Sequence, residues 1–458
     1  MNRKLLVALP VLLAGGAIAF IGPHGVAASG AIWMQPAGTM PPLSANDVSW
    51  LFPPPKTAAD TAKLIAVSDL MVPNAEDATK RDPVWSDTAF QQFVAIATSD
   101  RAQVAGTRSR IALPAAAKSK DAWFVAGVRI DAGAPGLSSD VRAQFGQSPQ
   151  IRLIVQPVSR AADGTVHPLD IAAHLVFNFV TNTEPFAQQG CSVRPVPDMA
   201  RLRTIVADLG QLRTKLSEGG FGDHIATAGA MGVHPGLVNA TTAAGVRQEM
   251  KAILERHLLA DRMRAMAVMG VPANQKAPWI FLAMQRMPTG FVPVPSPTLD
   301  GQQFAQMFTG SRVVPTPSTN NLNPITCKHA ALSPTLLPVT ERKGSATAEL
   351  FVSPPLATDK TKDILDRIAD PTKSHFFNTD CVSCHTETRR AMTLLRQTDF
   401  AGIDPGVLPN GDYNTRNFGW SPEADGPVRG TISRRTAAET AEGVAFINAQ
   451  LLSGSANR

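Results

Sequence analysis

The sequence predicts a multidomain α+β protein with a β-rich, sandwich-like N-terminal module, a helical middle segment and an all-α C-terminal domain. Three observations lead to this fold class. The chain has 458 residues, enough for about three domains. Runs of β-branched and aromatic residues give way after residue 198 to a 3.6-residue hydrophobic period. Only 17% of residues are charged, and 37 Pro and 34 Gly indicate many turns, which excludes a coiled coil or a wholly disordered chain.

Residues 1–28 have the parts of a secretory signal peptide. Arg3 and Lys4 form a basic start, Leu5–Ile21 is an almost unbroken apolar run, and Val26–Ala28 offers a small-residue cleavage site. An uncleaved anchor is the alternative, because the apolar run is at the short end for a spanning helix. No later run is long enough to span a bilayer. We therefore expect a periplasmic or otherwise exported protein with no stable membrane span after signal cleavage.

Residues 29–190 are predicted to form the β-rich domain. Short helical pieces are expected at 64–70 and 90–97. Three runs separated by turn-forming residues are then typical of strands: Trp123–Ile130, Ile151–Val155 and Leu175–Val180. In the last run three apolar residues alternate with Asn178, which favours a half-buried sheet. We expect this sheet to belong to a sandwich.

Residues 191–345 are predicted to be a helical segment with a Pro-rich linker. Apolar residues recur at helical spacing over 198–217 and 242–268. Met263, Met266 and Met269 would then share a helix face, with two further Met residues before residue 288. Thioethers can hold Cu(I), so the Met cluster at 263–287 is a possible copper site. A Met-rich packing face explains the same spacing more simply.

Charge excludes one class of partner. The formal net charge is +6, and no blocks of Lys and Arg or interleaved aromatic and basic residues occur. Binding to nucleic acids typically uses such basic patches. We expect no nucleic-acid partner.

The C-terminal part contains a Cys-x-x-Cys-His pentad, Cys381-Val382-Ser383-Cys384-His385. Random placement of the chain's four Cys and nine His would produce such a pentad only about 0.0005 times. Two thiols three residues apart lie on one side of a helical turn, where each can form a thioether with a haem vinyl group, and the next imidazole can bind the iron. A thioredoxin-like dithiol, a structural zinc site and a local disulfide are the alternatives, and they leave His385 without a role or lack their usual sequence context.

Residues from about 350 to 458 resemble a small c-type cytochrome domain. The resemblance rests on the pentad, on a short helix expected at 360–369 and on a terminal amphipathic helix expected at 434–452. It covers about a quarter of the chain, and residues 29–340 resemble no family that we recognise. We take 346–458 as the cytochrome c-like haem domain.

This resemblance implies one haem c, covalently attached through Cys381 and Cys384, with His385 as the proximal iron ligand. It also implies one-electron transfer to or from a redox protein partner. The sequence leaves two alternatives open. One is a haem enzyme, peroxidase-like or oxygen-activating, with an open distal position. The other is a binding module whose haem is structural or sensory.

The sequence does not identify the distal haem ligand. Small c-type cytochromes place a Met in the loop before the last helix, but residues 399–432 contain neither Met nor His. His375, six residues before the pentad, is a possible distal ligand, and Met392 is a weaker candidate because it follows His385 on the same expected helix. His329, a Met of the helical segment, and an open or water-bound iron are the other possibilities.

The other two cysteines, Cys191 and Cys327, are isolated in the sequence. In an oxidising compartment, a disulfide between them is the simplest prediction. Two buried thiols are the alternative.

Overall fold

The computed structural model describes residues 41–294 and 358–452, apart from short gaps at residues 75, 78, 101, 105–106, 135, 138–141, 143–145, 189–190, 274–279, 374–380, 411–413, 415 and 423–425. The signal peptide and the domain boundaries expected after residues 28, 190 and 345 fall outside this description, so they stay predictions. Residues 39–458 form one compact unit. No helix among the described residues is both long and apolar enough to cross a bilayer.

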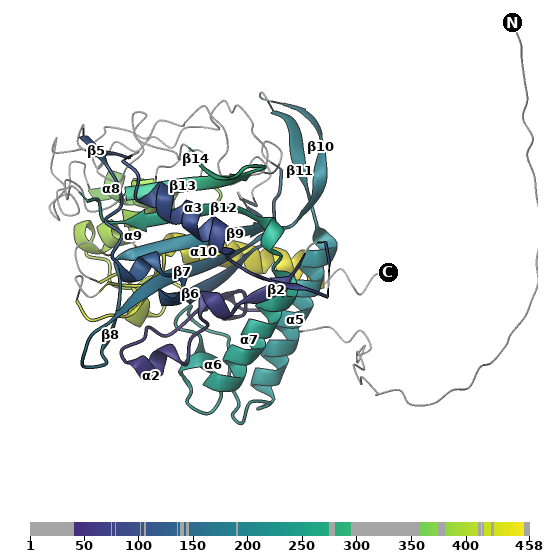
Figure 1. Ribbon diagram of the computed structural model, residues 1–458. Coiled ribbons are helices and arrows are strands. Elements are labelled where there is room, and N and C mark those ends of the chain that lie inside the picture. The colour runs from purple at the N-terminus through teal and green to yellow at the C-terminus, as the bar shows by residue number, and fades with distance from the viewer. Residues whose placement is uncertain are drawn as a thin grey trace, which may run out of the picture. The chain divides into compact units, whose positions relative to one another are not determined.

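A large antiparallel sheet of eight strands organises the described residues (Figure 1). Its order is β1-β6-β7-β9-β12-β13-β14, and β8 pairs with β7. The strands are β1 Ser49–Leu51, β6 Trp123–Asp131, β7 Gln150–Arg160, β8 Val166–Pro168, β9 Ile171–Asn178, β12 Met263–Gly270, β13 Ile280–Met287 and β14 Gly290–Val294. The mixed α and β class is confirmed, and the expected strands correspond to β6, β7 and β9.

The helix predicted over 242–268 is wrong in its second half. Helix α7 spans Ala243–His257, and the chain continues as strand β12, Met263–Gly270. The three-residue spacing of the Met residues matches the period of a helix, but β12 pairs with β9 on one side and with β13 on the other. Backbone pairing with both neighbours outweighs the local preference of a stretch rich in Ala and Met.

One face of the sheet is uniformly apolar. Leu153, Leu175 and Met266 are paired across neighbouring strands on this face and have no exposed surface. Helix α3, Asp87–Ala97, packs here, since the ring centroids of Phe93 and Trp123 are 5.5 Å apart. This helix confirms the expected helical piece at 90–97, and residues 67–69 form only a 3-10 turn.

The opposite face of the sheet is covered by the C-terminal segment. That segment consists of α8 Thr358–Ala369, α9 Cys381–Leu394, β15 Phe418–Trp420, β16 Gly430–Ile432 and α10 Arg434–Ile447. Asn178 is therefore 1% exposed, and the prediction of a half-buried sheet is wrong. The described strands form one large sheet and four two-stranded ribbons, so helices and this segment take the place of a sandwich's second sheet.

Gly127 permits a close approach of the C-terminal segment to the sheet. A Cβ atom at Gly127 would lie 2.5 Å from the Phe418 ring. That distance is shorter than any normal contact, so a side chain at residue 127 would displace β15.

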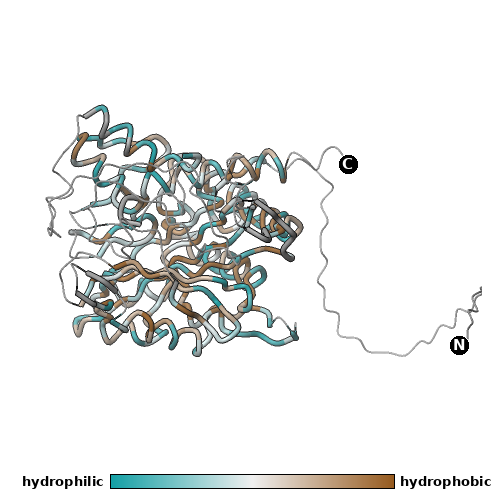
Figure 2. The backbone as a smooth tube through the Cα atoms, turned by 90° about the horizontal axis from the view of Figure 1, so that it is seen from above, coloured by the Kyte–Doolittle hydropathy of each residue, from teal (hydrophilic) through white to brown (hydrophobic). Residues whose placement is uncertain are grey.

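The remaining elements surround this core. Helix α5, Met199–Ser217, confirms the helix predicted over 198–217, and its Asp198 cap accepts a hydrogen bond from the Arg201 amide. The short helices are α1 Ala45–Val48, α2 Ala58–Thr61 and α6 Pro235–Val238. The other two-stranded ribbons are β2 Met71–Pro73 with β3 Arg81–Pro83, β4 Ala102–Val104 with β5 Thr107–Ser109, and β10 Val180–Gln188 with β11 Cys191–Pro197. The helices alternate hydrophilic and hydrophobic residues in Figure 2, as expected for helices that bury one side.

Candidate functional site

Helix α9 begins at the pentad. Cys381 is its first residue, and Cys384 and His385 follow one turn later. Residues three apart on a helix lie on one side, so the backbone of α9 places positions 381 and 384 on the same side of the helix. Cys384 and His385 are half-buried, and Cys384 packs against the hydrophobic core.

His385 lies against the sheet. Its ring contacts Phe281 of β13, with the ring centroids 4.7 Å apart and the planes tilted by 53°. The pentad, near the C-terminus of the sequence, is thereby held over a strand of the large sheet. The sequence predicts a haem domain separate from the β-rich module, and nothing in it indicates this contact.

His174 of β9 projects from the same face of the sheet as Phe281. His174 is paired with Ala267 of β12, and Ala267 is paired in turn with Ala283 of β13. Directly opposed residues of antiparallel strands point to one face, and so do residues two apart along a strand. Because Phe281 is two residues from Ala283, His174 faces the layer that contains His385.

The His174 imidazole is strongly desolvated. Burial, followed by the positive charges of Arg152, His385, Arg129 and Arg416, lowers the pKa of His174 to about 3. At neutral pH the His174 ring is therefore uncharged, which is the form of histidine that binds metal ions.

Three arginines surround this part of the face. Arg129 of β6 and Arg152 of β7 are cross-strand partners, and Arg416 comes from the segment before β15. Each makes one ion pair, with nitrogen to oxygen distances of 2.8 Å for Arg129 to Glu439, 2.8 Å for Arg152 to Asp131 and 2.6 Å for Arg416 to Asp170.

These arginines have donors left over. The Nε atoms of Arg129, Arg152 and Arg416 are buried without a hydrogen-bond partner among the residues that the structure describes. A buried donor left unpaired costs about 1–3 kcal/mol. Haem c carries two carboxylate groups, for which guanidinium groups are suitable donors. Two thiols, imidazoles and unpaired cationic donors together fit this cofactor.

A buried glutamate joins the three C-terminal helices. Glu387 of α9 has no exposed surface and accepts a hydrogen bond from Arg434 Nε of α10 at 3.0 Å. Arg434 Nη1 also contacts Asp366 of α8 at 2.9 Å. Burial raises the pKa of Glu387, although Arg434 opposes that shift. The arrangement holds α9, and with it the pentad, against both neighbouring helices.

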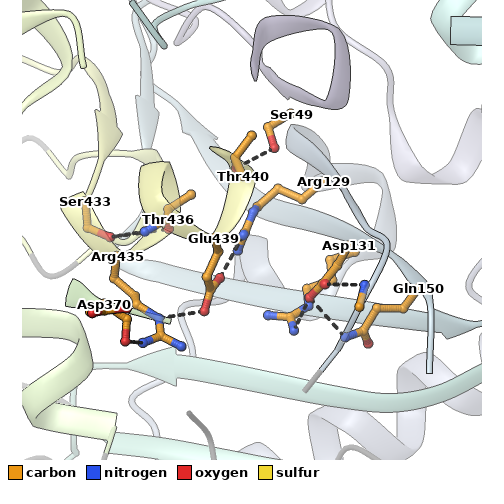
Figure 3. Close-up of polar contacts among 12 residues, drawn as sticks. Ser49, Arg129, Asp131, Gln150, Asp370, Ser433, Arg435, Thr436, Glu439 and Thr440 are labelled. Atoms are coloured by element: carbon orange, nitrogen blue, oxygen red, sulfur yellow. Dashed lines mark hydrogen bonds and ion pairs between the residues drawn. The ribbon is translucent and has the colours of Figure 1, made fainter. Parts of the chain in front are cut away.

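Glu439 of α10 joins the helical layer to the sheet (Figure 3). It accepts hydrogen bonds from Arg435 Nε on its own helix and from Arg129 Nη2 on β6, both at 2.8 Å. Burial alone would raise the pKa of Glu439, but the charges of Arg435, Arg129 and Arg152 outweigh it and hold the pKa well below the usual range. Glu439 is therefore an anion that fixes one of the site arginines.

Several residues proposed from the sequence lie outside the described residues. His375, His329 and Cys327 are among them, and so is the side chain of Cys191, which begins β11. The disulfide and the distal role of His375 stay predictions. Met392 does lie on α9, about 10 Å along the helix from His385, and packs against the core. A ligand on the helix of the proximal histidine cannot easily reach the opposite side of the iron, which favours packing.

The helix face that suggested a copper site does not exist. Met266 and Met269 lie on strand β12, and an odd spacing along a strand sends their side chains to opposite faces. Met266 is opposite Met284, and Met269 is opposite Phe281. Among the described residues, no group of three or more His, Cys, Asp or Glu side chains is placed to hold a metal ion. A haem iron does not require such a group, because the porphyrin supplies four of its ligands.

Sequence reasoning missed four residues of this site: His174, Arg129, Arg152 and Arg416. The first three interrupt otherwise apolar strands, and that interruption was an available signal. It identifies no partner by itself, because nothing local indicates that the opposing layer comes from residues more than 200 positions later.

Comparison with known proteins assigns no family. No family model matches the chain, and no curated protein or solved structure is significantly similar to it.

Proposed function

We propose that this protein is an exported monohaem c-type cytochrome that transfers single electrons through covalently bound haem. The observation that carries the proposal is the Cys-x-x-Cys-His pentad at the start of α9, with His385 directed to a sheet face rich in unpaired guanidinium donors. When bound, haem c supplies an iron that cycles between Fe(II) and Fe(III).

The chain's own residues would divide the work of holding this cofactor. Cys381 and Cys384 anchor it through thioethers, and His385 is the proximal ligand. Arg129, Arg152 and Arg416 would pair with the carboxylates of the haem. Their positive charges would favour the reduced Fe(II) state by electrostatic attraction. The sheet on one side and the C-terminal helices on the other limit access of water.

Export and a redox protein partner belong to the same proposal. Thioether attachment of haem takes place outside the cytoplasm, which agrees with the signal peptide predicted over residues 1–28. A relay of single electrons also requires a second redox protein, since the chain is proposed to hold one haem only.

The test is to produce the full chain in a bacterial host that exports it and attaches c-type haem. We expect a pyridine haemochrome spectrum typical of thioether-linked haem, and an intact mass one haem above that of the processed polypeptide. Replacing Cys384 by Ala should abolish the two-thioether product, and Cys191→Ala is the matched control that should retain it. Extraction of all colour by acidified acetone, or a mass equal to the bare polypeptide, would refute the proposal.

Carbon monoxide separates electron transfer from the haem-enzyme alternative. A six-coordinate relay should be indifferent to CO in the reduced state. Stoichiometric formation of a CO complex would instead favour a haem enzyme with an open distal position.

A further inference from the structure

An electron-transfer haem with two protein ligands needs a donor on the side of the iron opposite His385. That donor must come from a different element, because α9 already supplies the proximal ligand. The sheet face beneath α9 is one such element, since the His385 ring contacts Phe281 of β13.

The other described histidines outside α9 are engaged elsewhere or lie away from this face. His234 caps α6, His257 contacts Asp208 of α5 at 2.6 Å, and His224 contacts Ser217 O at 2.8 Å. His167 is on β8, the short strand paired only with β7. His174 alone among them is on a strand inside the large sheet and on the face that Phe281 shares.

The side chains around His174 leave its imidazole projecting further from the sheet than they do. Its neighbours on the same face are Ala172 and Val176 along β9, Ala267 across on β12 and Ile154 across on β7, all aliphatic and shorter than an imidazole. His174 and Ala267 are only half-buried, although both belong to interior strands. No hydrogen bond joins the His174 ring to any other residue in the described ranges, so both nitrogens are available to a ligand.

Met269 is the competing donor on this face. Its sulfur receives a contact from Arg416 Nη1 at 3.6 Å and is buried beside that guanidinium. A thioether engaged with a cation is the poorer donor of the two, and the uncharged imidazole of His174 is the better one.

We propose that His174 is the second axial ligand of the haem iron, so that β9 and α9 hold one haem through two imidazoles. The inference rests on the proposed function, because the covalently attached haem supplies the iron. Binding is a ligand exchange in which an imidazole nitrogen donates its lone pair to iron and a water molecule leaves, with no change of oxidation state. The β-rich part of the chain then takes a direct part in setting the redox potential.

The test uses the full-length haem-loaded protein, with pyridine haemochrome as a measure of attachment and optical and electron paramagnetic resonance spectra as measures of ligation. The wild-type ferric haem should be low-spin. His174→Ala should become high-spin, its reduced form should bind CO stoichiometrically, and added imidazole should restore the low-spin spectrum. Attachment in this variant should equal that of wild type.

Three further variants control the interpretation. His167→Ala and Met269→Leu should keep the low-spin spectrum. His174→Met retains a possible axial donor and serves if the Ala variant does not fold; thioether ligation should raise the reduction potential relative to wild type. A low-spin, CO-inert His174→Ala protein, or a His174→Met protein with a wild-type spectrum and potential, would overturn the inference, as would loss of the low-spin state in Met269→Leu alone.

The two proposals fail in different ways. If wild type carries no thioether-linked haem, the proposed function is wrong. If haem is attached but its spectrum does not depend on His174, only the axial assignment is wrong.

Discussion

The two faces of the large sheet differ in what they bury. On one face, Leu153, Leu175 and Phe177 are fully buried among other apolar side chains. On the other, Arg129, Arg152 and His174 project toward the C-terminal segment. Both faces are covered, but only the first consists of side chains whose removal from water lowers the free energy of the folded state.

This difference separates stability from function. Burial of a large apolar side chain stabilises a fold by about 1.5–3 kcal/mol, so the apolar face explains why the sheet forms. Burial of charged groups is unfavourable unless each is paired, and the Nε atoms of Arg129, Arg152 and Arg416 at this face are buried without a hydrogen-bond partner among the described residues. The polar face is the one at which we propose a bound cofactor, and the two faces can be tested one at a time.

The largest effect is expected from the apolar face. Phe177→Ala should lower the free energy of unfolding of the full chain by about 3–5 kcal/mol, because it opens a cavity in a fully buried region. Urea unfolding followed by circular dichroism measures this loss. Val176→Ala, the neighbour on the other face, should cost less, and an equal loss for both variants would show that the two faces contribute alike.

The next effect concerns the anion that links the sheet to α10. Glu439→Gln leaves Arg129 and Arg435 without their shared carboxylate, and should cost about 3 kcal/mol near neutral pH. Because the pKa of Glu439 is depressed, its stabilising contribution is complete above the unfolded value of 4.5 and is lost as the pH falls toward the lower folded pKa. The difference between variant and wild type should therefore be constant from about pH 7 to about pH 5 and shrink as the pH falls below about 4.5.

Glu442 provides the control for that prediction. Burial raises the pKa of Glu442, so its charged form is disfavoured in the folded protein. Glu442→Gln should be neutral or stabilising at neutral pH, measured by the same unfolding experiment. A pH-independent cost for Glu439→Gln would contradict the ion-pair explanation.

A smaller effect is expected where the C-terminal segment approaches the polar face. Gly127→Ala should destabilise the protein by about 1–3 kcal/mol, since its Cβ would overlap the Phe418 ring. Gly443→Ala is the matched control: no atom lies within 4 Å of its Cβ position, and the change should stabilise α10 by about 0.5–1 kcal/mol. Thermal unfolding of both variants measures the contrast, and equal shifts would argue against close packing at Gly127.

The smallest effect is expected away from both faces. Arg110 and Asp100 form an ion pair at 3.2 Å with about half of each side chain exposed. Arg110→Ala should change the free energy of unfolding by less than about 1 kcal/mol, and added salt should reduce the difference further. If Arg110→Ala lowered the free energy of unfolding as much as Glu439→Gln, residues at the sheet faces would contribute no more to stability than exposed residues.

The secondary structure was predictable where local signals are strong. Helices α3, α5, α8 and α9 coincide with helical patterns in the sequence, and α10 begins at Arg434 after Ser433, whose hydroxyl caps the helix by accepting from Thr436 N. Prediction failed at β12, because a strand's stability depends on the strands beside it more than on its own residues.

The sequence by itself determined that Cys381 and His385 belong to one pentad, and it predicted correctly that this pentad begins a helix, because both depend on residues within a few positions of each other. Only the tertiary structure decided that His385 meets Phe281 and that His174 faces the same layer. Strand register and the choice of covering layer are set by contacts between residues far apart in the chain. Those contacts depend on how all the elements pack together, so no short stretch of the sequence predicts them.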